Sequence, residues 1–163
     1  MVALAISREQ IMAWLDDVPD PEIPVLAITD LGIVRDVTIQ DDVIVELTPT
    51  YSGCPATEVI EQSVLDALHG HGLENVTIKR VLSPPWTTDW ITTEGREKLL
   101  KYGIAPPASG GSKRELLHGN RNIACPQCTS VNTSVVSEFG STACKASYKC
   151  NDCLEPFEYF KCI

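Results

Sequence analysis

The stretch TPTYSGCPATEVIEQSV, residues 48–64, decides how the first part of the chain folds. It follows an alternating apolar segment, 43–47, which is typical of a half-buried strand. It then opens a helical pattern in which Pro55 suits the first turn, where its missing N–H leaves no hydrogen bond unmade. A further strand pattern follows at 76–81. The sequence therefore predicts a strand, a crossover helix and a second, parallel strand.

The same stretch places Cys54 at or beside the N-cap of the predicted helix. Unpaired amide donors and the positive end of the helix dipole lie there, and both favour the thiolate form of cysteine. The thiolate is the form that binds soft metal ions. A single cysteine at a helix start is also compatible with a small, buried and inert residue. Cys54 is therefore a candidate metal ligand with a packing role as the alternative.

The rest of the main body, residues 1–105, completes a small sheet with helices on one face. Ser7 and Gln10 stand at capping-box spacing before an amphipathic helix, and strand patterns at 33–39 and 43–47 flank a polar turn. A last helix is predicted to end at Gly103. The expected fold class is α+β: a small mixed β-sheet with helices packed on one face, in the order helix, hairpin, helix, strand, helix.

Two polar pairs in the main body have structural explanations. Asp20 and Glu22 lie in a proline-rich segment where Asp commonly forms turns, and no nucleophile–base pair lies near them. His69 and His71 flank the end of the central helix, where a basic side chain is favoured by the helix dipole. We interpret the first pair as part of a solvated turn and the second as a helix end, rather than as catalytic or metal-binding groups.

The tail is predicted to be a metal-binding ribbon. Residues 106–122 are rich in Pro, Gly and Ser, which is typical of a linker, and residues 123–163 form a second, small all-β domain. Cys125–Cys128 and Cys150–Cys153 are CxxC pairs separated by 21 residues. Each CxxC turn presents two thiolates, and two such turns complete a tetrahedral site. A domain this small is expected to need metal in order to stay folded.

The sequence leaves open which metal the four cysteines bind and what role the remaining thiols have. Four cysteines suit zinc, iron or an iron–sulfur cluster, and zinc is the usual ion of a closed ribbon site. A CxxC can also act as a redox dithiol, but two matched pairs favour coordination. Cys144 and Cys162 are interpreted as small core residues, with a spare ligand as the alternative for each.

Composition excludes several classes of function. Residues 1–105 contain 17 acidic and 7 basic side chains, a net charge of −10, which opposes binding to nucleic acid. No apolar run approaches the length of a membrane span, and the N-terminal residues do not resemble a signal peptide. Without an export signal we expect a cytoplasmic protein, and in that reducing compartment seven cysteines favour metal ligation over disulfides. Catalytic triads and phosphate-binding loops are absent from the sequence.

Several motifs resemble the iron–sulfur assembly family that includes SufT and PaaD, and the tail is similar to that of its PaaD members. The matching segments of the main body are DPEIPVLAITDLGIV (20–34), TPTYSGCPATE (48–58) and SPPWTTDWITTEGREKLLKYGIAPP (83–107). Those of the tail are CPQC, FGSTACKASYKC (139–150) and CLEPFEYFKCI (153–163). The similarity covers nearly the whole chain.

The resemblance implies a maturation role rather than catalysis, in aerobic phenylacetate degradation. It identifies Cys54 as a transient iron–sulfur or iron ligand, with the phenylacetyl-CoA epoxidase reductase, the diiron oxygenase or both as clients. One cysteine cannot hold a cluster alone, so further ligands are expected from a client, another thiol or a homodimer partner. The alternative is a structural adaptor subunit in which Cys54 only packs.

Overall fold

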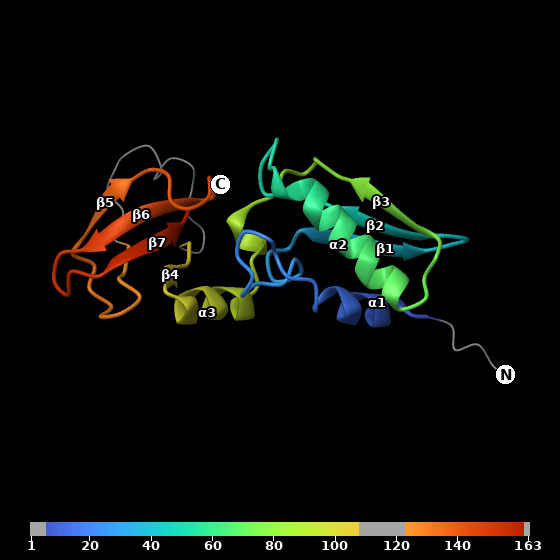
Figure 1. Ribbon diagram of the computed structural model, residues 1–163, viewed down its shortest axis with the longest axis horizontal. Coiled ribbons are helices and arrows are strands. Elements are labelled where there is room, and N and C mark those ends of the chain that lie inside the picture. The colour runs from blue at the N-terminus through green and yellow to red at the C-terminus, as the bar shows by residue number, and fades with distance from the viewer. Residues whose placement is uncertain (1–5, 108–122, 162–163) are drawn as a thin grey trace. The chain divides into compact units, whose positions relative to one another are not determined.

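The computed structural model describes residues 6–107 and 123–161 (Figure 1). The chain divides into two compact units between Trp86 and Thr87. Each unit has its own β-sheet, the first with three strands and the second with four.

The sheet of the first unit is mixed, as predicted. It contains β1 (Val34–Ile39), β2 (Val43–Leu47) and β3 (Val76–Arg80), in that spatial order. β1 and β2 form an antiparallel hairpin, whereas β2 and β3 are parallel. Alternate residues of β2 are buried, because one face of the sheet carries the helices and the other faces water.

Two helices, α1 (Arg8–Leu15) and α2 (Ala56–Gly70), lie on the same face of this sheet (Figure 1). α1 starts as its sequence predicts, because Ser7 Oγ accepts a hydrogen bond from the Gln10 amide. α2 faces the sheet with a stripe of buried apolar side chains at helical spacing: Ala56, Ile60, Val64 and Leu68. Full burial of each large side chain in the stripe contributes about 1.5–3 kcal/mol.

Asp20 shapes the segment between α1 and β1. Asp20 is only 6% exposed, so its carboxylate is buried rather than solvated as the sequence suggested, whereas Glu22 is half-buried and Pro21 and Pro24 are exposed. Asp20 Oδ1 accepts hydrogen bonds from the amides of Glu22 and Ile23, at 2.9 and 2.7 Å. Two backbone donors thus balance the desolvation of the carboxylate, which explains how the charge is buried without a catalytic role.

The second unit includes more of the chain than the sequence assigned to the ribbon. After a short 3₁₀ turn, η1 (Thr88–Trp90), come α3 (Thr93–Tyr102) and β4 (Ile104–Ala105). α3 ends at Gly103, as predicted, and Gly103 adopts the left-handed conformation with φ of 88°. β4 pairs in parallel with the last strand of the chain. The compact units divide between residues 86 and 87, so the ribbon sheet includes a strand from outside the tail, while the predicted domain bounds of 1–105 and 123–163 with a linker at 106–122 stay a prediction.

The ribbon sheet has the strand order β4-β7-β6-β5. β5 (Thr133–Ser137) and β7 (Pro156–Phe160) each pair antiparallel with β6 (Lys145–Cys150). A small buried cluster packs beside the strands: Ala105, Ile123, Cys125, Ala146, Tyr148, Cys150, Phe157 and Tyr159. Two of these buried side chains are cysteines, so the apolar core of the ribbon merges with its sulfur cluster. Among the residues described, the helices are too short or too polar for one to cross a bilayer.

Candidate metal centre

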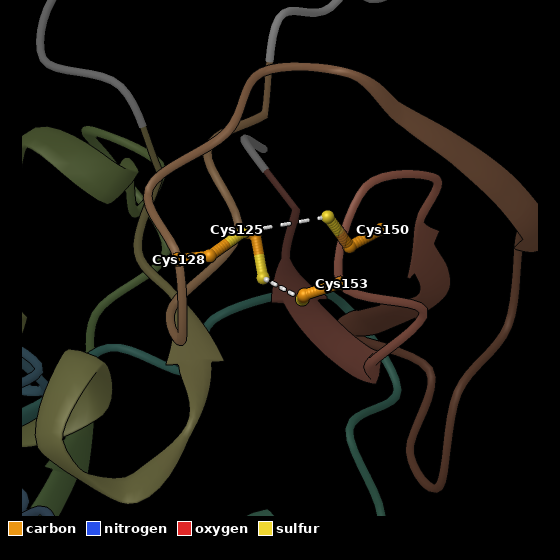
Figure 2. Close-up of side chains that lie close together, drawn as sticks. All are labelled: Cys125, Cys128, Cys150 and Cys153. Carbon is orange, nitrogen blue, oxygen red and sulfur yellow. Dashed lines mark hydrogen bonds between the residues drawn. The ribbon is translucent and has the colours of Figure 1, made fainter.

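The two CxxC loops bring four sulfurs together at one end of the ribbon sheet (Figure 2). The first loop, 125–128, precedes β5, and the second, 150–153, begins on the last residue of β6. The four Sγ atoms lie within 4.8 Å of one another. Cys125 Sγ is 3.7 Å from Cys153 Sγ, and Cys128 Sγ is 3.6 Å from Cys150 Sγ. Each close pair therefore joins one loop to the other.

These distances fit a single tetrahedral ion. Zinc–sulfur bonds of about 2.3 Å place the sulfurs at the corners of a tetrahedron about 3.8 Å apart. A cluster of several iron atoms needs more room, because its four thiolates are shared among two or four iron atoms rather than gathered around one. The donor set and its spacing thus match one ion held by Cys125, Cys128, Cys150 and Cys153.

The backbone of each loop directs its two thiolates inward. The Thr129 amide donates to the Cys125 carbonyl, and the Cys150 amide donates to the Glu155 carbonyl, both at 2.9 Å. The residue after the second cysteine of each loop is left-handed: Thr129 with φ of 62° and Leu154 with φ of 66°. Residues with side chains rarely adopt this conformation, and for a β-branched residue such as threonine it is a clear outlier. Both loops therefore hold the same strained turn.

The thiols differ in exposure and acidity. Cys125 and Cys150 are buried, whereas Cys128 and Cys153 are exposed. The backbone amide of Cys153, and after it that of Asp152, donates toward the Cys150 sulfur and lowers the pKa of Cys150 to about 7, against the opposing effect of desolvation. The pKa of Cys153 moves the other way: although the Glu155 amide lowers it, desolvation and the neighbouring thiols raise it to about 12. The site by itself therefore favours the thiolate at Cys150 over that at Cys153.

Cys54 belongs to the first unit and lies beside the start of α2. Pro55 is the N-cap residue, and the Cys54 carbonyl accepts a hydrogen bond from the Thr57 amide at 3.2 Å. Gly53 has φ of 81°, which turns the chain into the helix at a position unfavourable for other residues. Cys54 itself is half-buried. Within residues 6–107 and 123–161, the four-cysteine group is the one place where three or more metal-ligand side chains gather, so Cys54 has no such set around it.

Cys144, His69 and His71 are the other described cysteine and histidine residues besides Cys54, and they lie outside that group. Cys144 is buried in the ribbon, and its sulfur lies 3.0 Å from Thr142 Oγ1. Cys162 is outside the described residues. The His71 ring stacks on the Trp14 ring, with centroids 4.2 Å apart and planes 4° from parallel. His71 therefore packs the end of α2 against α1, consistent with its interpretation as a structural residue.

Comparison with known families assigns a class to each part of the chain. Residues 8–79 match the family described as iron–sulfur cluster assembly protein. Residues 109–161 match the PaaD zinc beta ribbon domain. The chain thus combines an iron–sulfur assembly module with a zinc ribbon, as the sequence motifs indicated.

A similar protein defines the family more narrowly. The chain is 51% identical over 155 residues to an Escherichia coli (strain K12) protein named as one subunit of a "Putative 1,2-phenylacetyl-CoA epoxidase", covering 94% of this chain and 92% of that protein. The chain belongs to the family of this epoxidase subunit.

Two solved structures resemble its assembly module. The crystal structure of a domain of unknown function, DUF59, from Bacillus anthracis has a TM-score of 0.53 and 27% identity, covering 56% of this chain and 90% of that one. A conserved hypothetical protein from Thermotoga maritima has a TM-score of 0.51 and 31% identity, covering 60% and 98% respectively. Both support the α+β fold of the module.

Proposed function

We propose that this chain is a non-catalytic accessory protein of a 1,2-phenylacetyl-CoA epoxidase system, which assists the loading of iron–sulfur clusters or iron into the epoxidase components. The observation that carries the proposal is the pairing, on one chain, of two different sulfur sites. One is a closed set of four thiolates in the ribbon, and the other is the single thiol Cys54 on the assembly module.

The ribbon site is suited to permanent binding. Its four thiolates fill every position of a tetrahedral ion, which leaves no open position for a substrate or a transferred metal. The close sulfur–sulfur distances of 3.7 and 3.6 Å match those around one tetrahedral ion, which favours zinc or a single iron over a cluster. The match to a zinc ribbon family favours zinc. We therefore assign the ribbon a structural zinc ion and a docking role.

Cys54 is suited to transient binding. It sits beside the N-terminus of α2, and it is half-buried rather than enclosed, so a client can reach its sulfur. Without three neighbouring ligands, a cluster or iron ion bound there must take its other ligands from a client, from small thiols or from a second copy of the chain. Incomplete ligation makes the bound group easy to release, as transfer requires. The thiols need a reducing compartment, for which the cytoplasm is our proposal.

Substitution of Cys54 tests the proposal. We would co-express Cys54→Ala with the epoxidase oxygenase and reductase and measure the iron content and visible absorption of both purified clients. We expect iron loading to fall several-fold, while zinc in the variant stays at one per chain. Cys144→Ala is the matched control, because it removes a thiol from outside both sites. Full client loading with Cys54→Ala would refute metal delivery.

That same result would favour the alternative function, an adaptor that organises the complex without transferring metal. The half-burial of Cys54 gives this alternative its support, since a packing role also explains that environment. An adaptor would co-purify with the clients in both variants. Light scattering before and after anaerobic cluster reconstitution would test the homodimer: a monomer in both states would exclude a cluster shared between two copies.

A further inference from the structure

One acidic side chain joins the two cysteine loops of the ribbon. Asp152 lies inside the second loop, between Cys150 and Cys153. Its Oδ2 accepts a hydrogen bond from Ser130 Oγ, and its Oδ1 accepts one from Asn132 Nδ2 at 2.7 Å. Ser130 and Asn132 both follow directly after the first loop. A single carboxylate in one loop therefore binds the segment that leaves the other.

The neighbouring residue completes the connection. The Asn151 amide donates to the Asn132 carbonyl at 2.9 Å, and Asn151 Nδ2 donates to Asn132 Oδ1 at 3.2 Å. These contacts also determine the orientation of the Asn132 side chain. Its carbonyl oxygen faces the donor on Asn151, so its amino group must face the acceptor on Asp152. The Oδ1 position of Asp152 therefore requires a hydrogen-bond acceptor.

We propose that Asp152 is a positioning residue for the metal centre, which holds the two cysteine loops in register so that their thiolates meet at tetrahedral spacing. This inference rests on metal binding by the ribbon and not on the role of Cys54. Both close sulfur pairs span the two loops, so a slip of one loop relative to the other would disturb both. Hydrogen bonds beyond the ligands commonly tune metal affinity in this way, and their loss typically costs 10–100-fold.

The direction in which metal affinity changes when Asp152 is neutralised distinguishes an effect of its charge from an effect of its hydrogen bonds. Four thiolates around a divalent ion leave a net charge of −2, and a nearby carboxylate repels that charge. If Asp152 acted only through its charge, neutralising it would strengthen metal binding. If it acts through its hydrogen bonds, Asp152→Asn weakens binding. The asparagine oxygen can accept from Asn132 Nδ2, but its amino group then replaces the oxygen that accepts from Ser130 Oγ.

The matched control is Glu155→Gln. Glu155 is an exposed acid just beyond the same loop, and its side chain makes no hydrogen bond or ion pair within residues 6–107 and 123–161. We would measure the zinc affinity of the full chain by competition with a chromogenic chelator. We expect a 10–100-fold loss for Asp152→Ala, a smaller loss for Asp152→Asn, and unchanged or slightly tighter binding for Glu155→Gln. Equal affinities in wild type and Asp152→Ala, or tighter binding by Asp152→Asn, would overturn the proposal.

Two further measurements cover the case in which Asp152→Ala does not fold. Ser130→Ala and Asn132→Ala each remove one arm of the connection, and we expect losses of affinity smaller than that of Asp152→Ala. The cobalt-loaded forms report the arrangement of the sulfurs directly, through ligand-field bands that a loss of stability alone does not shift. Bands and affinities identical to wild type in both single-arm variants would likewise overturn the proposal.

Discussion

Glu158 offers the sharpest test of how the ribbon is held together apart from its metal. This side chain on β7 accepts a hydrogen bond from Lys145 Nζ on β6 at 2.8 Å and another from the Ser141 amide at 2.6 Å. It therefore connects the turn between β5 and β6 to the last strand. The side chain of Lys145 is only 6% exposed, whereas that of Glu158 is 28% exposed.

The magnitude follows from these contacts. Glu158→Ala removes two hydrogen bonds that involve a charge, each of about 1.5–3 kcal/mol, and leaves an almost buried ammonium without its partner. Breaking a fully buried pair costs about 3–5 kcal/mol, but partial exposure of Glu158 screens this one. We therefore expect a loss of about 2–3 kcal/mol for Glu158→Ala. Glu158→Gln keeps an acceptor for Ser141 and should lose about 1–2 kcal/mol.

The assay is chemical denaturation of the zinc-loaded protein, with hydrogen exchange at the Ser141 amide as a local probe. Exchange at this amide should accelerate strongly in Glu158→Ala. Glu155→Ala removes the same charge from an exposed position and should change stability by less than about 0.5 kcal/mol. An effect of Glu158→Ala as small as that of the control would show that the turn does not depend on this carboxylate.

The same contacts predict a pH dependence. Partial burial acts to raise the pKa of Glu158, but the hydrogen bonds from Lys145 and from the Ser141 amide outweigh it and lower that pKa below 4.5. Since the folded pKa lies below the unfolded one, the stabilisation is complete above pH 4.5 and is lost as the pH falls through the folded value. Acid also protonates the metal-binding thiolates, so the stability of the whole ribbon in acid would report metal loss as well as Glu158. NMR titration of the Glu158 carboxyl carbon follows this one group and is therefore the appropriate measurement. A pKa at or above 4.5 would contradict the prediction.

Three other predictions concern the remaining structure. Leu154→Gly should raise the free energy of unfolding of the zinc-loaded ribbon by about 0.5–1 kcal/mol in chemical denaturation, because relief of the left-handed strain exceeds the entropy cost of glycine. Leu154 is 62% exposed, so a loss of stability would show that its side chain makes a stabilising contact of its own. Leu68→Ala should destabilise the first unit by about 2–5 kcal/mol, measured by the same method, because the side chain is fully buried on α2; a loss well below this range would mean that the helix contributes little to the core. Removal of metal by a chelator should abolish hydrogen-exchange protection in β6 and leave that of α2 intact, since the small ribbon core includes two of the ligands; equal protection in both would argue against a structural ion.

The parts of the fold that were predicted correctly depend on signals close together in sequence. The stripe of Ile60, Val64 and Leu68 repeats at helical spacing, and Ser7 and Gln10 form a local cap. The matched spacing of the two CxxC pairs likewise predicts that these four thiols lie together, as they do. Such features require only a few neighbouring residues to agree, so periodicity and composition reveal them.

The parts that were missed depend on contacts between distant segments or on strain. β4 has two residues, too few for a strand pattern, and it forms only because β7 lies beside it. Glycine usually marks a left-handed turn, so Leu154 gave no sequence cue for its conformation. Asp152 occupies an ordinary loop position, and only the folded backbone brings Ser130 and Asn132 within its reach.

The pairing of β4 with β7 determines how the ribbon can be excised for study. A fragment that starts at Ile123 would retain all four ligands but would leave β7 without its outer neighbour. Copies of the fragment would then tend to pair through the exposed edge of β7, and this artificial association would look like a natural dimer in solution measurements. A fragment beginning at Thr87 keeps that edge covered and is the appropriate piece for isolated expression.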